Sequence, residues 1–271
     1  KLHADGSYGW TLSNSLVEAG GGFYTVTVDG NDDVYVSGSA QISALDAQIS
    51  GTKQLDFDPT AGVDMITMVG QPEGYVSKFH GDGSYAWTRV FSGHGTYTSS
   101  NVPISQIIGV AANAAGGIDL LGTFNDTLYL DPGATSSLAS PSNSKCAFSE
   151  FATRIKADGS YGGWVWALPA NYTSFARDSK GNMYLTGPFQ QNSQYNPFYC
   201  TSNSVSDRYT SAQGSAVLTK VNASGSYGWT KPFWSVPNNT TSHGIGEKVA
   251  VGRGDNAYVG GDSPATSGAA S

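Results

Sequence analysis

Charged side chains are scarce in this sequence, and cysteine, methionine and histidine are scarcer still. Of 271 residues, 13% are charged, and there are 2 Cys, 3 Met and 4 His. The formal net charge is −7, and the 14 Lys and Arg residues do not cluster along the chain. We therefore expect no nucleic-acid partner. No apolar run approaches the roughly 20 residues of a membrane-spanning helix, so no membrane span is expected.

Signatures of catalysis are also missing. No nucleophile elbow, zinc motif or phosphate-binding loop occurs in the sequence. The histidines do not have the spacing of a metal-ligand set: His3, His80, His94 and His243. The sequence therefore predicts that the protein is not an enzyme.

Targeting signals are not recognisable at either end. The chain opens at Lys1 without the charged and apolar regions of a signal peptide, so we expect any signal peptide to have been removed or to lie outside this sequence. Residues 264–271 are small and resemble a tail or linker.

Glycine and tyrosine, by contrast, are abundant, with 35 and 15 copies. One motif, Ala-Asp-Gly-Ser-Tyr-Gly-Trp in its first copy, returns three more times at tyrosine-to-tyrosine intervals of 77, 76 and 66 residues. Periods this long and regular indicate one supersecondary unit used four times. The copies occupy residues 4–10, 81–87, 157–164 and 223–229.

Each copy predicts a β-hairpin. Asp-Gly between two alternating runs is a strong hairpin signal, because glycine adopts a positive φ without steric cost. The incoming runs alternate as half-buried strands do: residues 74–79, 151–155 and 216–221. The third copy, Tyr161-Gly162-Gly163-Trp164, has one residue more than the others, which predicts a β-bulge there.

A second type of hairpin lies between these copies. Its turns are centred on residues 29–31, 115–117, 180–182 and 254–256. Two hairpins per period predict a four-stranded antiparallel sheet, and such sheets repeated radially are the blades of a β-propeller. The expected fold is all-β.

The order of the hairpins predicts three complete blades, at about residues 23–92, 106–170 and 173–235. The remaining halves, residues 247–262 and 1–12, are complementary. We expect them to build a fourth blade from both chain ends and to close one domain over residues 1–263. Two alternatives stay open. In the first, the chain is a piece of a longer array of blades, and each half pairs with residues outside this sequence. In the second, the halves pair between molecules and give a head-to-tail filament.

Three sequence patterns together resemble a known family. They are Lys-x-x-x-Asp-Gly-x-x-x-Trp at residues 78–87, Asp-x-x-Gly-Asn-x-Tyr-x-x-Gly at 178–187 and Asp-Phe-Asp-Pro-x-x-Gly at 56–62. The chain resembles the bacterial secreted β-propeller repeat family (SBBP-type repeats) over nearly its whole length. The resemblance implies a secreted or cell-surface propeller and no particular catalytic activity. The long segments 40–53 and 190–213 depart from the compact form of that family.

One tryptophan recurs at the same offset in every copy: Trp10, Trp87, Trp164 and Trp229. A large side chain at one position per unit is expected to fill the space between neighbouring units, although aromatic faces also stack on sugars. Trp234, Tyr199 and Trp166 lie outside the repeat and are therefore the candidates for a ligand-binding surface.

Several aspartates are candidate calcium ligands, since calcium binds carboxylate and carbonyl oxygens. Asp56 and Asp58 are the candidates, together with Asp29, Asp32 and Asp33. The loop pattern of an EF-hand is absent, and Asp-Pro and Asp-Gly are ordinary turn chemistry. The turn interpretation is favoured, with no cofactor, and calcium stays as the alternative.

Cys146 and Cys200 are the only thiols. In a secreted chain they are expected to form one disulfide, which in the chain-entropy model contributes on the order of 4 kcal/mol. Two unpaired thiols are the alternative. Candidate glycosylation sites follow the Asn-x-Ser/Thr pattern: Asn125, Asn171, Asn222, Asn238 and Asn239.

Three functions from different classes remain. The first is a non-catalytic extracellular structural or interaction module that binds itself or other cell-surface proteins, as a polymer or filament. The second is a glycan-binding propeller. The third is a polysaccharide-active enzyme with carboxylates at a central channel, drawn from Glu73, Glu150 and Glu247.

Overall fold

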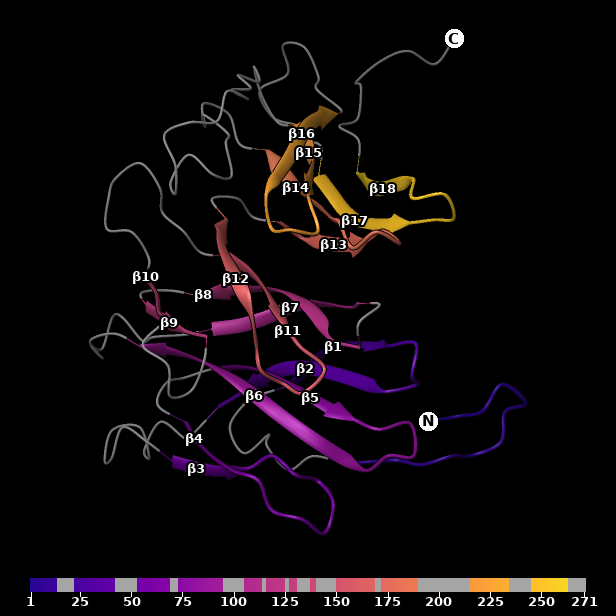
Figure 1. Ribbon diagram of the computed structural model, residues 1–271, viewed down its shortest axis with the longest axis vertical. Helices are drawn as coiled ribbons and strands as arrows, with labels where there is room; N and C mark the ends of the chain where they lie inside the picture. Colours follow the sequence, from indigo (N-terminus) through magenta and orange to yellow (C-terminus); the bar gives the residue numbers. More distant parts are fainter. Residues whose placement is uncertain are drawn as a thin grey trace. The chain divides into compact units, whose positions relative to one another are not determined.

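The computed structural model contains β-strands joined by tight turns, and no helix occurs among the residues it describes (Figure 1). Those residues are 1–13, 22–41, 53–68, 73–94, 105–113, 116–124, 127–130, 137–139, 150–168, 172–189, 215–233 and 245–262. Within them, no helix is long and apolar enough to cross a membrane.

The chain divides into two compact units. The first holds Lys1–Ser140 and Phe151–Val165, and the second holds Pro141–Glu150 and Trp166–Ser271. Each unit is described by itself below.

The predicted four-stranded antiparallel sheets are present. The first is β1 (Gly22–Val28), β2 (Val34–Ala40), β5 (Glu73–Phe79) and β6 (Tyr85–His94), in that order. The second is β12 (Tyr161–Leu168), β11 (Glu150–Ile155), β8 (Ile118–Phe124) and β7 (Ser105–Ala112). The third is β13 (Ser174–Arg177), β14 (Met183–Phe189), β15 (Ser215–Val221) and β16 (Tyr227–Phe233).

Two further hairpins lie inside the connections between β2 and β5 and between β8 and β11. One is β3 (Lys53–Asp56) with β4 (Met65–Met68), a sheet of its own. The other is β9 (Thr127–Tyr129) with β10 (Ser137–Ala139). Since β9 pairs with β6, the first sheet has six strands rather than four. The sequence did not predict these strands.

The hairpins of the repeat each place a residue of positive φ in the turn, and the last one, between β17 (Ile245–Val251) and β18 (Ala257–Asp262), places two, Gly254 and Asp255. In the Asp-Gly hairpins, Gly6, Gly83, Gly159 and Gly225 have φ between 81° and 92°, which confirms the role predicted for glycine. The other hairpins place Asp32, Gly116, Gly181 and Asp255 in the same left-handed region. In the first of these, the positive φ therefore falls on Asp32 and not on Gly30. Aspartate tolerates this conformation better than most residues.

Bulges follow the Asp-Gly turns. The register between β5 and β6 shifts at Lys78/Phe79, opposite Trp87 and Tyr85, so Ala86 is the extra residue. The pair β15 and β16 shifts at Lys220/Val221, which makes Gly228 the extra residue. Both of these bulges lie in copies that lack the additional glycine of residues 161–164. The bulge predicted for residues 161–164 themselves stays a prediction.

The core consists of the apolar side chains that the strands bury. In the first unit, a cluster of buried side chains joins the insertion β3–β4 to the first sheet: Ala40, Phe57, Met68, Tyr75 and Val90. A close backbone approach accompanies this packing. A Cβ on Gly38 would lie 1.9 Å from the carbonyl oxygen of Gly22 on β1, so only glycine fits at that point of β2.

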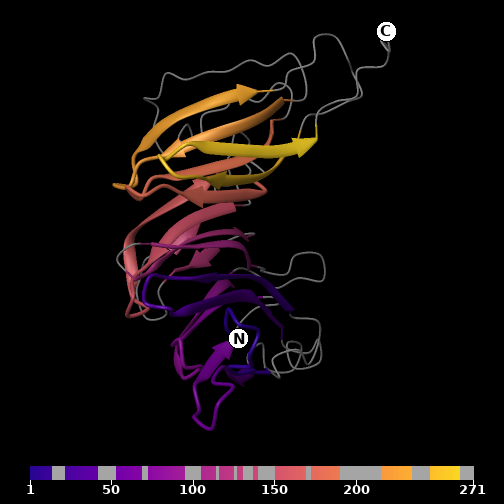
Figure 2. The ribbon, with the colours of Figure 1, turned by 90° about the vertical axis from the view of Figure 1, so that its right-hand side faces the viewer.

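The hairpins also stack on one another within each unit. In the first unit, β7 packs against β1 and β2. In the second unit, β17 (Ile245–Val251), which forms a two-stranded sheet with β18 (Ala257–Asp262), packs against β13 and β14 (Figure 2). At the N-terminus, Leu2 and Tyr8 form a single antiparallel bridge. The pairing of residues 1–12 with 247–262 into a fourth blade stays a prediction.

Candidate functional site

Most of the predicted ligand-binding and modified residues lie outside the described residues. This holds for Trp234, Tyr199, Cys146, Cys200, Asn125, Asn171, Asn238 and Asn239. Trp166 lies in β12, but its side chain is not among those described. The lectin surface, the disulfide and these glycosylation sites therefore stay predictions.

Asn222 is the one sequon asparagine that the structure describes. It is half-buried, and its Nδ2 donates to the hydroxyl of Ser226 at 2.9 Å and to the carbonyl of Tyr227 at 3.2 Å. These bonds hold the turn before β16. The nitrogen that would carry a glycan is thus already engaged.

Asp56 and Asp58 bind nearby backbone. Oδ1 of Asp56 accepts from the amides of Asp58 and Asp64, at 3.1 and 2.8 Å. Oδ1 of Asp58 accepts from the amide and the hydroxyl of Thr60. Asp29 behaves likewise, accepting from the amides of Asn31 and Asp33. This is the turn chemistry favoured by the sequence. Among the described residues, no cluster of three metal-ligating side chains occurs.

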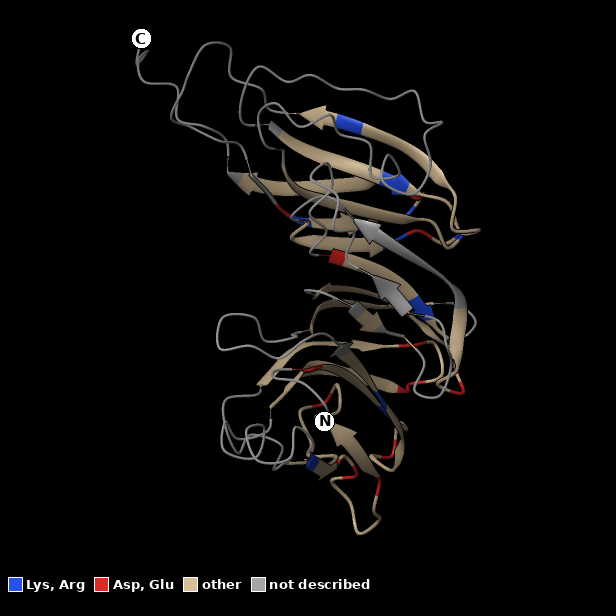
Figure 3. Cartoon of the chain, turned by 90° about the vertical axis from the view of Figure 1, so that its left-hand side faces the viewer, with Lys and Arg blue, Asp and Glu red and all other residues tan. Residues whose placement is uncertain are grey.

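Many acidic residues accordingly lie in the turns that end the strands (Figure 3). In the Asp-Gly turns, Oδ1 of Asp5, Asp82 and Asp158 accepts the amide of the serine two positions later. The serine hydrogen bonds lower the pKa of all three carboxyls.

The three glutamates of the enzyme hypothesis differ in environment. Glu73 on β5 is fully buried, and Glu247 on β17 is exposed. Glu150 is 3% exposed and accepts a hydrogen bond from the amide of Tyr172 at 2.8 Å. Burial raises its pKa to about 8, although the amide acts in the opposite direction.

An ion pair with a buried lysine lies beside the second Asp-Gly turn, residues 81–83. Nζ of Lys78 on β5 lies 2.8 Å from Oδ2 of Asp33 and 5.3 Å from the centre of the Tyr35 ring. Nδ1 of His80 lies 3.0 Å from Oδ1 of the same aspartate. Burial pushes the pKa of Asp33 up, but the bonds and charges of Lys78 and His80 outweigh it and hold the pKa below its ordinary value.

The clearest recurrent contact joins the first Asp-Gly hairpin to the second and the second to the third. Nε1 of Trp10 donates to the carbonyl of Gly81 at 3.0 Å, and Nε1 of Trp87 donates to the carbonyl of Ala157 at 3.1 Å. Both acceptors directly precede the aspartate of the next turn. Each indole therefore recognises the same point of the following copy, about one repeat away.

Each indole also covers the glycine of that next turn. A Cβ on Gly83 would lie 3.0 Å from the ring of Trp10, and a Cβ on Gly159 would lie 2.9 Å from the ring of Trp87. Glycine is thus required at this position for two reasons: it adopts the positive φ, and its lack of a side chain leaves space for the indole. The predicted filling role of the repeated tryptophan is confirmed for Trp10 and Trp87.

Basic side chains accompany the indoles. Nζ of Lys1 donates to the carbonyl of Gly81 at 2.9 Å, and Nζ of Lys78 donates to the carbonyl of Ala157 at 3.3 Å. Nε of Arg89 donates to the carbonyl of Gly159 at 2.6 Å. We call Lys78, Trp87 and Arg89, and the residues at the same positions of another copy, a donor set. The Asp-Gly turn that such a set binds, here residues 157–159, is called a receptor turn, and so is the same turn of any other copy.

Sequence reasoning missed the donor set as a unit. A signal was present, because a basic residue nine positions before the tryptophan and another two positions after it recur as Lys220, Trp229 and Lys231. Their offset from the tryptophan is the same in both copies. Which carbonyl they reach depends on contacts between repeats, which no local pattern encodes.

The turns of the other hairpins also stack within each unit. The hydroxyl of Tyr35 donates to Asp29 at 3.0 Å and also contacts the carbonyl of Gly116 in the following hairpin. In the second unit, the amide and the hydroxyl of Ser179 donate to the carboxylate of Asp255 at 2.8 and 3.0 Å. The stacking of successive turns is therefore a property of both hairpin types.

An apolar hollow of 190 Å³ opens beside the first of these contacts. It lies between the N-terminal segment and the first sheet and is lined mainly by Trp10, Leu12, Phe23 and Phe79. The lining offers few polar groups. A sugar, whose hydroxyls need hydrogen-bond partners, fits such a surface poorly.

Blocking a receptor turn tests the docking directly. Gly159→Asn is expected to lower the free energy of unfolding by about 2 kcal/mol, because asparagine tolerates the positive φ but its Cβ overlaps the Trp87 ring. Chemical denaturation followed by tryptophan fluorescence measures the loss. Gly254→Asn is the matched control, since φ is +84° there and the nearest atom to the added Cβ, Nδ2 of Asn256, lies at 3.7 Å, an ordinary contact distance. Equal losses in both variants would contradict the docking.

A search of protein-family models and of curated proteins found no match to this chain.

Proposed function

We propose that this chain is a non-catalytic extracellular β-propeller that acts as a structural or interaction module and assembles with itself or with other cell-surface proteins. Its blades would be the four-stranded sheets, with a fourth blade made from residues 247–262 and 1–12. Secretion or display at the cell surface follows from the resemblance to SBBP-type repeats.

One observation carries the proposal: successive hairpins bind each other through the same directional contact. Trp10 on the turn of Gly83 and Trp87 on the turn of Gly159 repeat the same indole, carbonyl and glycine. A contact repeated at a constant step arranges units about an axis, as in propellers and solenoids. The aspartates considered as calcium ligands are used in turns and in an ion pair, as Asp29, Asp33 and Asp56 are.

Electron microscopy and glycan arrays test the proposal together. Purified protein is expected to give ring-shaped particles, alone or joined into polymers, and no binding on a glycan array. Particles shaped as flat sandwiches without a central axis would contradict the propeller. Glycan binding that is lost in Trp234→Ala or Tyr199→Ala would favour the lectin function instead.

A further inference from the structure

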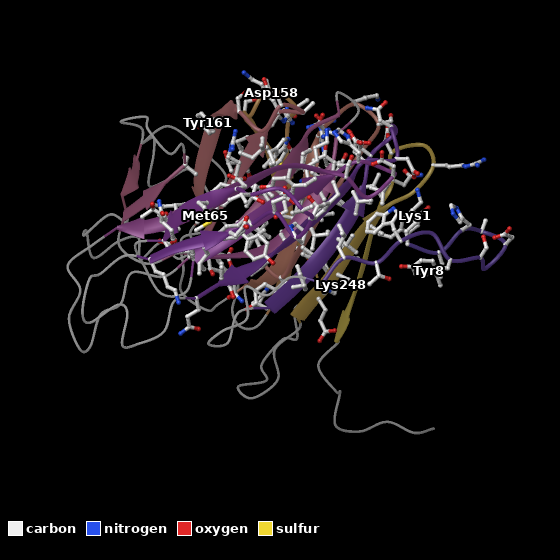
Figure 4. All side chains as sticks on the ribbon, turned by 90° about the horizontal axis from the view of Figure 1, so that it is seen from below. Lys1, Tyr8, Met65, Asp158, Tyr161 and Lys248 are labelled. Carbon is white, nitrogen blue, oxygen red and sulfur yellow. The ribbon has the colours of Figure 1, made fainter. Side chains whose placement is uncertain are left out.

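The first receptor turn is uncovered in its own unit. Nothing lies within 4 Å of a Cβ built on Gly6, whereas Gly83 and Gly159 are each covered by an indole. The residues beside it are also exposed, with 70% of Leu2 and 67% of Tyr8 accessible. Figure 4 shows Tyr8 beside Lys1 on the N-terminal hairpin.

This turn repeats the sequence of a turn that is occupied. Residues 4–9 read Ala-Asp-Gly-Ser-Tyr-Gly, and residues 157–162 read the same. The backbone is also the same: the amide of Gly6 donates to the carbonyl of His3, as that of Gly159 does to Lys156, and both glycines have φ of +81°. A ligand that fits residues 157–159 therefore fits residues 4–6.

A second donor set is present in the other unit. Lys220, Trp229 and Lys231 stand on β15 and β16 where Lys78, Trp87 and Arg89 stand on β5 and β6. Trp229 packs edge-on against Tyr184 at 6.1 Å, as Trp87 packs against Tyr35 at 6.0 Å, and Lys220 lies 5.7 Å from the Tyr184 ring centre. The structure gives Nε1 of Trp229 no acceptor among the described residues.

We propose that Trp229 of one copy docks on the turn of residues 4–6 of a second copy and joins the chains head to tail. The indole covers Gly6 and donates to the carbonyl of Ala4. Lys220 reaches the same carbonyl, and Lys231 takes the place of Arg89 and donates to the carbonyl of Gly6. The sequence contains both halves of this contact, the donor set on β15 and β16 and the turn of residues 4–6.

The partner is a second copy because the contact is directional and its two halves differ. An interface that joins unlike surfaces of identical chains adds one copy after another. Asp5, which is exposed in the turn of residues 4–6, also offers the incoming lysines the opposite charge. The inference rests on the proposed function and names its partner: the fourth blade is completed between molecules.

Sedimentation velocity across a wide range of protein concentrations tests the inference. The unaltered chain is expected to associate increasingly with concentration. Trp229→Ala and Gly6→Asn should each weaken association by about tenfold or more, since a buried tryptophan dominates such contacts. Met65→Ala is the control, because this side chain is 47% exposed on β4, outside the donor set and outside the fourth blade, and the variant should associate as the unaltered chain does.

An equimolar mixture of the two variants gives the sharpest result. Gly6→Asn keeps its donor set and Trp229→Ala keeps its receptor turn, so the mixture should form dimers and grow no further. A mass of one chain for the unaltered protein at every concentration would overturn the inference. Ring-shaped particles seen by microscopy in that same case would mean closure within one chain and would leave the proposed function standing.

Discussion

The free energy of unfolding is expected to fall as the pH rises from about 4.5 to about 8, because Glu150 must then be buried as an anion. Its pKa is raised to about 8 in the folded chain from an ordinary value of 4.5. A carboxyl that keeps its proton more tightly when folded stabilises the fold below its ordinary pKa, and this contribution is lost as the pH rises to the folded pKa. At about 1.4 kcal/mol for each pH unit, the loss is on the order of 5 kcal/mol.

Replacing Glu150 by glutamine is expected to remove this fall. The amide oxygen of glutamine still accepts from the Tyr172 amide, and no charge has to be buried. Urea denaturation at pH 5 and at pH 9 measures the difference. Glu247→Gln is the control, because Glu247 is exposed on β17. An unchanged pH dependence in Glu150→Gln would show that Glu150 is ionised without cost in the folded chain.

Replacing Lys78 by methionine is expected to lower the free energy of unfolding by about 3 kcal/mol. Methionine keeps the length of the side chain but leaves Asp33, whose side chain is only 13% exposed, with the half-exposed His80 as its one remaining basic partner among the described residues. Removing one member of a buried ion pair is costly because the remaining charge stays desolvated. The carbonyl of Ala157 also loses one of its two donors.

The matched control is Lys220→Met. Lys220 lies over Tyr184 as Lys78 lies over Tyr35, but the residue at the position of Asp33 is Asn182. Its replacement is expected to cost less than about 1 kcal/mol. The pH dependence separates the variants further. Asp33, whose pKa is lowered, stabilises the fold above its ordinary pKa and loses that contribution in acid, so Lys78→Met should flatten the acid side of the stability curve. Equal losses in both variants would show that the ion pair contributes nothing.

The part of the fold that could be predicted is the part that local sequence patterns determine. Asp-Gly between alternating runs fixes a hairpin within a few residues, so the four-stranded sheets could be read from the sequence. The bulge at Ala86 could not, because it depends on how many residues oppose one another across two strands. The positive φ of Asp32, where Gly30 was the obvious candidate, depends on the register of the whole turn.

The candidate site was harder to predict for a related reason. The periodicity identified Trp10 and Trp87 and suggested that they fill space between units. It could not show that the filled space is the surface of a glycine, because Gly83 and Gly159 already had a sufficient explanation in the turn itself. A glycine that serves both the turn and the packing of an indole looks the same in the sequence as a glycine that serves the turn alone.

Both tight turns of each sheet fall at the same end of its strands, because the first and third strands run in the same direction. Lengthening a connection there would disturb stacked turns, whereas the connections between hairpins leave from the opposite end, where the insertion β3–β4 is already accommodated. The end of each sheet that carries the tight turns is therefore constrained by the stacked turns, and the opposite end is open to variation. Evolution of new specificity, and the grafting of foreign peptides, should take place at that opposite end.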